Sequence, residues 1–394
     1  MIKKILLGAI MSAMPLFSAE LPDKPMFKIL DTAHKMALND NILLSPYSIQ
    51  QCFGMVRIGA GRKSAEEIDK ILGINEALFE ELKAADKSLK ENQNAKFSSC
   101  NSIVFNDKLA LQKKFVDAAA DFFGGKCYKA DFSRKKECAD MLNKLVAEQS
   151  FNMFDKVFTE RDFANDPDMV LMNVLYFKAL WNREFEIFMT RNRKFTCADG
   201  SVKPVKMLCD ERYLPYFSDG GIHGVILDYQ EKRFGMMFLM TEDPAQPVTK
   251  VIEALADKGV EYFVKKSSYK YKTILSLPKL KMETDCDLAK LFKKAGIKHL
   301  FDPQTGDLIY IVDNTTDPLY IDSARQLVKL DLNETGTEMA AVTYAMAKCG
   351  SAPPRPEKKN IFRAERPYVL VLFDRTTKAV LLSGVINDPS KAKN

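Results

Sequence analysis

The segment Met169–Phe177 limits the possible folds of this chain more than any other. It reads Met-Val-Leu-Met-Asn-Val-Leu-Tyr-Phe, with Asn173 as its only amide side chain. An apolar run of this length without alternation predicts a β-strand that is covered on both faces. Such a strand needs helices or a second sheet on either side, so the chain must build a large core.

The remaining patterns are mostly helical early in the chain and mostly β-like later. Ser64-Ala-Glu-Glu predicts a helix start at which Ser64 caps against Glu67. This order predicts an α+β fold with large sheets. The other expected helices are 26–38, 48–60, 111–123, 138–150 and 287–295, and the expected strands are 98–106, a series of short strands from Phe195 to Leu280, and two within 368–385.

Composition agrees with one large globular domain. The 394 residues are 46% hydrophobic and 28% charged, and no repeat or long linker divides them. The net charge of +6 arises from 58 basic and 52 acidic residues, a surplus too dispersed to indicate nucleic acid binding. Eight cysteines lie at irregular spacings without a Cys-x-x-Cys pair, which leaves both disulfides and buried free thiols open.

The first residues predict a secretory signal peptide. Met1–Lys4 is basic, Ile5–Phe17 is apolar, and the small pair Ser18-Ala19 precedes polar sequence. We therefore expect a signal at 1–19 and a secreted chain, extracellular or periplasmic, at 20–394; a buried first helix is the alternative. No later apolar run reaches about 18 residues, so no membrane helix is expected.

The segment 335–360 departs from the pattern of the rest. Its first half is small and compatible with a strand, whereas its second half contains Pro353, Pro354 and Pro356, which cannot continue the interior of a sheet. Long irregular segments within a domain are often functional. A passive disordered loop is the alternative.

The chain carries no motif of an enzyme. Its three histidines, His34, His223 and His299, include no pair at a helical metal-binding spacing. Neither a Gly-x-Ser-x-Gly elbow nor a glycine-rich phosphate loop is present. We therefore expect no catalysis, cofactor or metal, although a site assembled in space needs no sequence motif.

Six segments, in order, resemble the serpin family of serine protease inhibitors, from about Pro25 to Pro389. Each segment alone is a weak match, but six in the family order are specific. They are Asn41–Ile49, Asn173–Trp181, the block from Leu277-Pro-Lys-Leu-Lys-Met to Leu300-Phe301, Asn333-Glu-Thr-Gly-Thr-Glu-Met-Ala-Ala, Phe362-Arg-Ala-Glu-Arg-Pro-Tyr, and Ser383-Gly-Val-Ile-Asn with Pro389.

The resemblance implies a single monomeric domain with three β-sheets, about nine helices and an exposed reactive-centre loop at about 334–361. A target protease, serine or also cysteine, would cut this loop and form an acyl-enzyme. The cut loop would then insert as a new strand into the largest sheet. A non-inhibitory member, acting as a binding or storage protein, is the alternative.

The resemblance also assigns the hinge of the loop: Glu334, Gly336, Thr337, Met339, Ala340 and Ala341. Alternation in a strand would put Thr337, Met339, Ala341, Thr343 and Ala345 on one face. Glu338 belongs to the other face, because a buried unpaired carboxylate is costly. Met339 is larger than the residue that the family prefers there and could slow insertion.

Five residues match the region where the sheet opens: Ser45, Ser48, Asn173, Trp181 and Gln326. Gln326 stands where the family usually has a histidine, and an amide can both donate and accept hydrogen bonds. No histidine-linked pH effect is therefore expected at this place.

Counting seventeen residues from Glu334 in the family manner places the bait bond at Gly350-Ser351, with Lys348-Cys349 as the second candidate.

Basic residues at Arg134–Lys136 and Lys265–Lys272 could contact a sulfated polysaccharide, although a solvated surface is the stronger interpretation.

Overall fold

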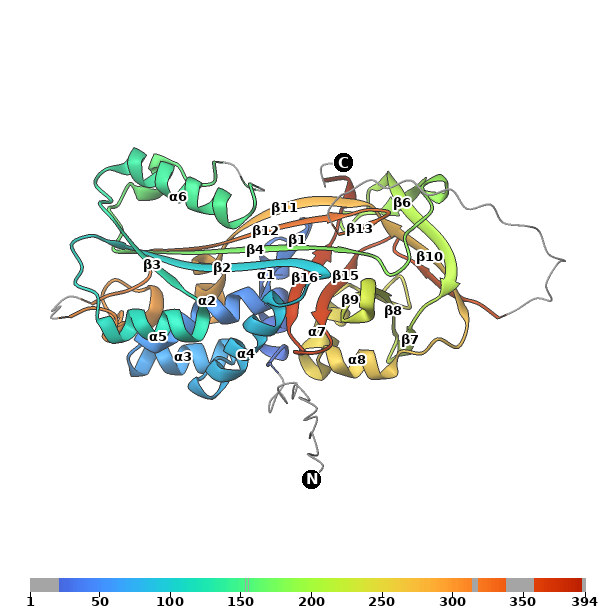
Figure 1. Cartoon of the computed structure of the whole chain (residues 1–394). Helices are drawn as coiled ribbons and strands as arrows, with labels where there is room; N and C mark the ends of the chain where they lie inside the picture. The colour runs from blue at the N-terminus through green and yellow to red at the C-terminus, as the bar shows by residue number, and fades with distance from the viewer. Residues whose placement is uncertain (1–20, 153, 155, 314–317, 338–357, 392–394) are drawn as a thin grey trace, which may run out of the picture.

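The apolar segment in the middle of the chain folds as β4 and lies inside a six-stranded sheet, here called the long sheet. The computed structural model describes residues 21–152, 154, 156–313, 318–337 and 358–391 (Figure 1). The long sheet runs in the order β11 (Leu280–Asp287), β12 (Ser323–Leu332), β13 (Gly336–Thr337), β4 (Met169–Leu180), β2 (Ala95–Asn106) and β3 (Lys126–Ala130).

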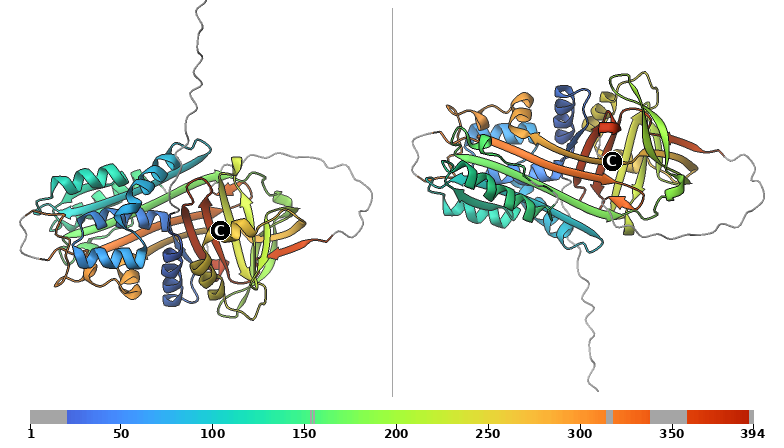
Figure 2. Two further views of the ribbon diagram at one scale, coloured as in Figure 1. Left: turned by 90° about the horizontal axis from the view of Figure 1, so that it is seen from below. Right: turned by 90° about the horizontal axis from the view of Figure 1, so that it is seen from above.

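Two further sheets complete the β-structure. The core sheet packs beneath one half of the long sheet, and the small sheet lies at the same end of the molecule (Figures 1 and 2). The core sheet runs β1 (Ile42–Leu44), β16 (Val380–Ile386), β15 (Tyr368–Asp374), β9 (Phe234–Thr241), β8 (Ile222–Asp228) and β7 (Tyr216–Asp219). The small sheet runs β14 (Asn360–Arg363), β10 (Lys272–Pro278), β6 (Val202–Tyr213) and β5 (Arg191–Thr196).

Nine α-helices occur among the described residues, and the α+β prediction is confirmed. They are α1 (Lys24–Met36), α2 (Pro46–Gly59), α3 (Arg62–Leu72), α4 (Phe79–Lys90), α5 (Lys113–Phe123), α6 (Lys135–Gln149), α7 (Thr249–Lys258), α8 (Val260–Lys266) and α9 (Leu288–Ala295).

Two local predictions were wrong. The stretch from Phe195 to Leu280 holds α7 and α8 as well as strands. Ser64 does not start a helix, because α3 begins at Arg62 and Ser64 lies buried in its first turn. The Asp307 carboxylate accepts from the Lys63 and Ser64 amides instead, at 3.0 and 3.1 Å. A residue distant in sequence therefore satisfies these helix-end donors.

β4 is covered on both faces, as its sequence predicts. Val170, Met172 and Val174 belong to a cluster under α6, together with Phe132 and Phe163. The alternate residues, including Leu171 and Phe177, belong to the main core. The half of the long sheet near α6 is therefore enclosed from above and below (Figure 1).

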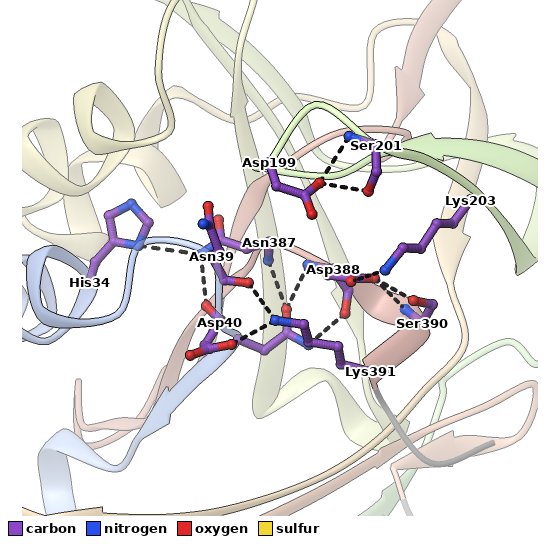
Figure 3. Close-up of polar contacts among 11 residues, drawn as sticks. His34, Asn39, Asp40, Asp199, Ser201, Lys203, Asn387, Asp388, Ser390 and Lys391 are labelled. Atoms are coloured by element: carbon purple, nitrogen blue, oxygen red, sulfur yellow. Dashed lines mark hydrogen bonds and ion pairs between the residues drawn. The ribbon is translucent and has the colours of Figure 1, made fainter.

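The C-terminal segment is tied to the start of the core sheet by a polar network (Figure 3). Asn387 Nδ2 donates to Asp40 O at 2.7 Å, and the nearly buried Asp388 carboxylate pairs with Lys203 Nζ at 2.6 Å. Burial alone would raise the pKa of Asp388, but the bonds from Lys203 and Ser390 lower it to about 2. The last described turn is thus held by an ionised carboxylate.

Candidate functional site: the opening in the long sheet

β12 and β4 run parallel but pair directly along only part of their length. Their direct pairing extends from Ser323 opposite Val170 to Val328 opposite Leu175. Seen from above, the two strands lie side by side along the long sheet (Figure 2). Towards the other end β13 lies between them, with Thr337 opposite Leu332 of β12 and also opposite Ala179 of β4. The long sheet is therefore open at one end and closed at the other.

A tight turn joins β12 to β13. Asn333 N donates to Gly336 O at 3.0 Å, and Asn333 Oδ1 accepts from the Thr335 amide at 3.0 Å and its hydroxyl at 2.9 Å. β12 and β13 thus form an antiparallel hairpin. The hairpin places Gly336 and Thr337 in the space between β12 and β4.

Gly336 is required by the close approach of two backbones. A Cβ atom at this position would lie 2.2 Å from Ala179 O and 2.8 Å from Leu180 Cα in β4. Both contacts are far inside van der Waals distance and involve main-chain atoms that cannot rotate away. The sequence predicts Gly336 as a flexible pivot, and the structure adds a steric reason for glycine.

Glu334, the first predicted hinge residue, is anchored on both oxygens. Lys279 Nζ lies 2.8 Å from Oε2, and Thr190 Oγ1 donates to Oε1 at 3.0 Å. Burial raises the pKa of this carboxyl, but the contacts with Lys279 and Thr190 outweigh it and lower the pKa below its ordinary value. The Glu334 carbonyl accepts from Phe185 N at 2.8 Å.

Trp181 holds the hairpin from the end of β4. Its ring Nε1–H donates to Asn333 O at 2.9 Å, and its backbone N–H donates to Thr335 O at 2.9 Å. The ring stacks on Tyr229 with centroids 4.4 Å apart. Tyr229 in turn shares a 2.5 Å hydrogen bond with Thr337 Oγ1, so the Thr337 side chain faces the core. Trp181 therefore both packs in the core and directly supports the β12–β13 hairpin.

The closed end of the pair sits on a buried hydrogen-bond network, here called the closing network. Gln326 Oε1 accepts from Ser45 N at 2.9 Å, and its Nε2 donates to Ser45 O at 3.1 Å and Asn173 Oδ1 at 3.0 Å. Asn173 Nδ2 donates to Asn101 Oδ1 at 2.6 Å and to Ser48 O at 3.2 Å. The amides of β12 and β4 are thus bonded directly to each other and to α2.

Four of the five residues predicted for sheet opening, Ser45, Ser48, Asn173 and Gln326, meet in this network, while Trp181 lies at the other end. Sequence reasoning missed Asn101 and Ser99, whose hydroxyl lies 3.1 Å from Ser48 Oγ. A signal existed, because β2 holds four polar residues within Ser98–Ser102, between the apolar Phe97 and Ile103. The role of these residues in opening stays a prediction.

The remaining predicted residues lie outside the described part of the chain. They are the hinge residues Met339, Ala340 and Ala341, and the bait-bond candidates Lys348, Cys349, Gly350 and Ser351.

Six cysteine side chains are described, and all six are free thiols: Cys52, Cys127, Cys138, Cys197, Cys209 and Cys286. Burial raises the pKa of Cys52 to about 12 and that of Cys127 to about 11, which suppresses thiolate formation at neutral pH.

Within the described ranges, no three acidic, histidine or cysteine side chains are grouped to hold a metal ion. No helix in those ranges has the length and apolar character needed to cross a bilayer.

Comparison with known proteins identifies the family. The family model "Serpin (serine protease inhibitor)" matches residues 24–389. Human glia-derived nexin is 24% identical over 393 residues, covering 95% of this chain and 94% of the relative. Chicken neuroserpin is 28% identical over 364 residues, covering 89% and 87%.

Solved structures share the fold. Native protease nexin-1 crystallised with heparin superposes with a TM-score of 0.81 at 22% identity, covering 94% of this chain and 98% of that one. Thyroxine-binding globulin in complex with thyroxine superposes with a TM-score of 0.81 at 21% identity, covering 93% and 97%. With a family model that spans nearly the whole domain and this shared architecture, the chain belongs to the serpin family.

Proposed function

We propose that this protein is a secreted suicide-substrate inhibitor of serine endopeptidases, and also of cysteine endopeptidases. The observation that carries the proposal is the placement of Gly336 and Thr337 between β12 and β4. The chain that follows them is the predicted bait loop. An opening already occupied by the first residues of that loop supports insertion of the rest after cleavage.

The strand register supports the same conclusion. Thr337 lies opposite both Leu332 and Ala179. Continuing the antiparallel register along either neighbour brings residue 343 opposite Gln326 on one side and Asn173 on the other. Gln326 and Asn173 are already opposite each other in the closed part of the sheet. Both flanking strands therefore accept the loop in one common register, without a slip.

The side-chain pattern of the loop fits that register. Thr337 faces the core through its bond to Tyr229. Side chains alternate along a strand, so Met339, Ala341 and Thr343 would follow Thr337 inwards, and Glu338 would stay outside. Each inserted residue would gain hydrogen bonds worth about 0.5–1.5 kcal/mol each. The ladder would therefore supply the driving force for trapping.

The chemistry would be supplied by the protease. Its nucleophilic oxygen or sulfur attacks the carbonyl carbon of Gly350, the C–N bond to Ser351 breaks, and the leaving nitrogen takes the proton. The bait chain remains bonded to the enzyme as an acyl group. Insertion would then carry the acyl-enzyme along the long sheet before water can hydrolyse it.

A panel of purified proteases tests the proposal. Trypsin-like, elastase-like, subtilisin-like and papain-like enzymes are each incubated with the protein and resolved on a denaturing gel. We expect a band at the summed mass with at least one serine protease and a released fragment that begins at Ser351. Cleavage without that band and without higher heat stability would contradict inhibition.

Two neighbouring substitutions isolate the insertion step. Ala341→Arg places a cation on the inward face, opposite Leu175 and Val328, where burial of an unpaired charge is prohibitive. We expect this variant to be cut as a substrate without forming a stable complex. Ala340→Arg carries the same change on the outward face and should still form the complex. Equal behaviour of the two variants would refute the proposed register.

Met339 favours a second candidate, a non-inhibitory binding or storage protein. In the proposed register Met339 meets Phe177, whose ring packs against Tyr229 and Phe234 at 5.3 Å between centroids. A long side chain entering this cluster could stop insertion at the hinge. Thyroxine-binding globulin, with the same fold, is described as a ligand complex rather than a protease complex. Met339→Ala should speed complex formation if the protein is an inhibitor with a slow step.

Secretion is proposed from residues 1–19 alone. Expression from Met1 in a secreting host should release a protein whose first residue is close to Glu20. An intact Met1 on retained protein would contradict secretion.

Heparin is a candidate partner because protease nexin-1, which shares the fold, was crystallised with it. Affinity chromatography of this protein on immobilised heparin at increasing salt tests the same interaction, since charge-based binding weakens as salt rises. Elution at low salt would contradict heparin binding.

A further inference from the structure

A pocket of about 300 Å³ opens beside the hinge, at the end of β4. Its lining residues come from five segments: the end of β4, the end of β6, the end of β8, the short turn before β9, and the connection between α8 and β10. This volume suits a small molecule with roughly ten to twenty heavy atoms. The side chains that matter for its chemistry are Asn182, Arg183, Arg212, Asp228, Lys232 and Tyr269.

The pocket is cationic. Arg183, Arg212 and Lys232 line it against one lining carboxylate, Asp228, whose oxygens are engaged by Arg375 Nη2 at 2.7 Å and Tyr269 Oη at 3.0 Å. Asp210, the other nearby carboxylate, lies 3.8 Å from Arg183 and 3.3 Å from Arg212. Across the described residues, Lys232 Nζ has no carboxylate within 4 Å. Three lining cations, with Arg375 bound to Asp228 behind them, therefore stand against the two carboxylates Asp210 and Asp228.

Arg212 is the unusual member of this group. Its side chain is 6% exposed, and its guanidinium lies 4.5 Å above the Phe185 ring. Nη1 donates to Arg183 O at 2.6 Å, whereas the buried Nε lies 3.3 Å from Asp210 Oδ2 without the geometry of a hydrogen bond. Burial lowers the pKa of Arg212 to about 10. Asp210 therefore balances the charge of this buried cation but accepts no hydrogen bond from its Nε–H, and a buried donor without a hydrogen bond is costly.

Backbone hydrogen bonds connect the residues around the pocket to the β12–β13 hairpin. Asn182 N donates to Asp228 O at 2.9 Å, directly after Trp181, whose own N–H holds Thr335. Phe185, the ring beneath Arg212, donates its N–H to Glu334 O at 2.8 Å. A ligand that binds Arg183 or Arg212 therefore contacts residues next to Trp181 and Phe185, which bond to the hairpin.

We propose that this pocket binds a small molecule with clustered anionic oxygens, and that its occupancy steadies the hinge. Such a ligand would neutralise Arg183 and Lys232 at the rim and supply an acceptor for Arg212 in the interior. Charge-assisted hydrogen bonds of this kind are the strong ones. The second part of the proposal rests on the proposed hinge function, whereas the first does not.

Binding is measured by Trp181 emission, since Trp181 is the only tryptophan of the chain. The full chain is titrated with citrate and with inorganic pyrophosphate, which separate a carboxylate site from a phosphate site. We expect a saturable change for at least one probe, with a dissociation constant below about 1 mM. The affinity should fall as salt rises. No saturable change with either probe, together with no thermal shift, would overturn the site.

A charge-matched pair of variants separates the pocket from general electrostatics. Arg183→Ala with Lys232→Ala removes two rim cations without emptying the buried Arg212 position, and should weaken binding by at least about tenfold. Lys114→Ala with Lys144→Ala removes the same charge from exposed positions on α5 and α6 and should leave binding unchanged. Equal weakening in both pairs would overturn the site.

Amide hydrogen exchange tests the link to the hinge. Saturating probe should slow exchange at Asn333–Thr337, and the Arg183→Ala, Lys232→Ala protein should lose this protection. Unchanged exchange with bound probe would overturn the coupling and leave the binding site standing. Neither readout uses a protease, so failure of the inhibitory proposal is distinguished from failure of this one.

Discussion

The two ends of the β12–β4 pair are held by different kinds of contact. At the closed end, Gln326 and Asn173 are fully buried and bond to each other and to α2. At the open end, the hairpin is held by Trp181 and by the ion pair between Lys279 and Glu334, which water reaches in part. This difference indicates at which end the two strands can separate at the lower cost in free energy.

The cost of separation explains the contrast. Breaking a buried polar network leaves donors and acceptors without partners, at about 1–3 kcal/mol for each group. A partly exposed ion pair exchanges its partner for water and contributes about 1 kcal/mol or less. The hinge end can therefore rearrange while the closed end still keeps the strands in register.

The largest effect is expected from Asn173→Ala, which removes the centre of the closing network. Gln326 Nε2 and Asn101 Oδ1 would both lose a partner. We expect the free energy of unfolding to fall by about 2–5 kcal/mol, measured by urea unfolding followed through Trp181 emission. Asn192→Ala, an exposed amide on β5, should change it by less than about 0.5 kcal/mol. Similar losses in the two variants would mean that the network does not hold the closed end.

A smaller and local effect is expected from Gly336→Ala. Its Cβ would collide with Ala179 O, so β13 should leave the sheet at a cost of about 1–3 kcal/mol. Trp181 would lose its acceptor at Asn333, shifting its emission, and limited proteolysis should begin near the hinge. Thr335→Ser has no such clash, keeps the hydroxyl that donates to Asn333 Oδ1, and serves as the control. An unaltered emission spectrum in Gly336→Ala would show that the hinge tolerates a side chain.

The smallest effect is an acid sensitivity confined to the hinge end. The pKa of Glu334 is lowered in the folded protein, so its contribution is present above the ordinary glutamate pKa of about 4.3 and is lost as pH falls through the lower folded value. Trp181 emission should therefore change on acidification before global unfolding, and Glu334→Gln should remove that step. The closing network contains no titratable side chain. If Glu334→Gln showed the same change in Trp181 emission on acidification as the unmodified protein, this assignment would be contradicted.

Much of the fold could be predicted because its signals are local. The apolar run of β4 and the helical spacing of α1, α2 and α5 depend on neighbours in sequence. The start of α3 could not be predicted, because the acceptor that satisfies its amides, Asp307, lies more than two hundred residues away. A capping pattern at Ser64 was present but unused, since a tertiary contact replaced it.

The candidate site, like the fold, was predictable in part: most of its residues could be identified from the sequence, but their contacts could not. The resemblance to serpins pointed to Gln326 and Asn173, but their direct bond depends on the register between two strands from distant parts of the chain. Asn101 joins them only because β2 lies on the other side of β4. The steric demand at Gly336 likewise arises from Ala179, which no local pattern relates to it.

The hairpin between β12 and β13 has a kinetic consequence. Joining distant strands normally requires a loop to close before any contact forms, and this entropy makes the first pairing slow. Here the turn at Asn333–Thr335 is already closed and the first rung is in place. In the proposed insertion, strand addition would therefore begin past its nucleation step, and each later residue would be positioned by the one before it. Whether insertion precedes hydrolysis of the acyl-enzyme would then depend on the rate of strand propagation alone.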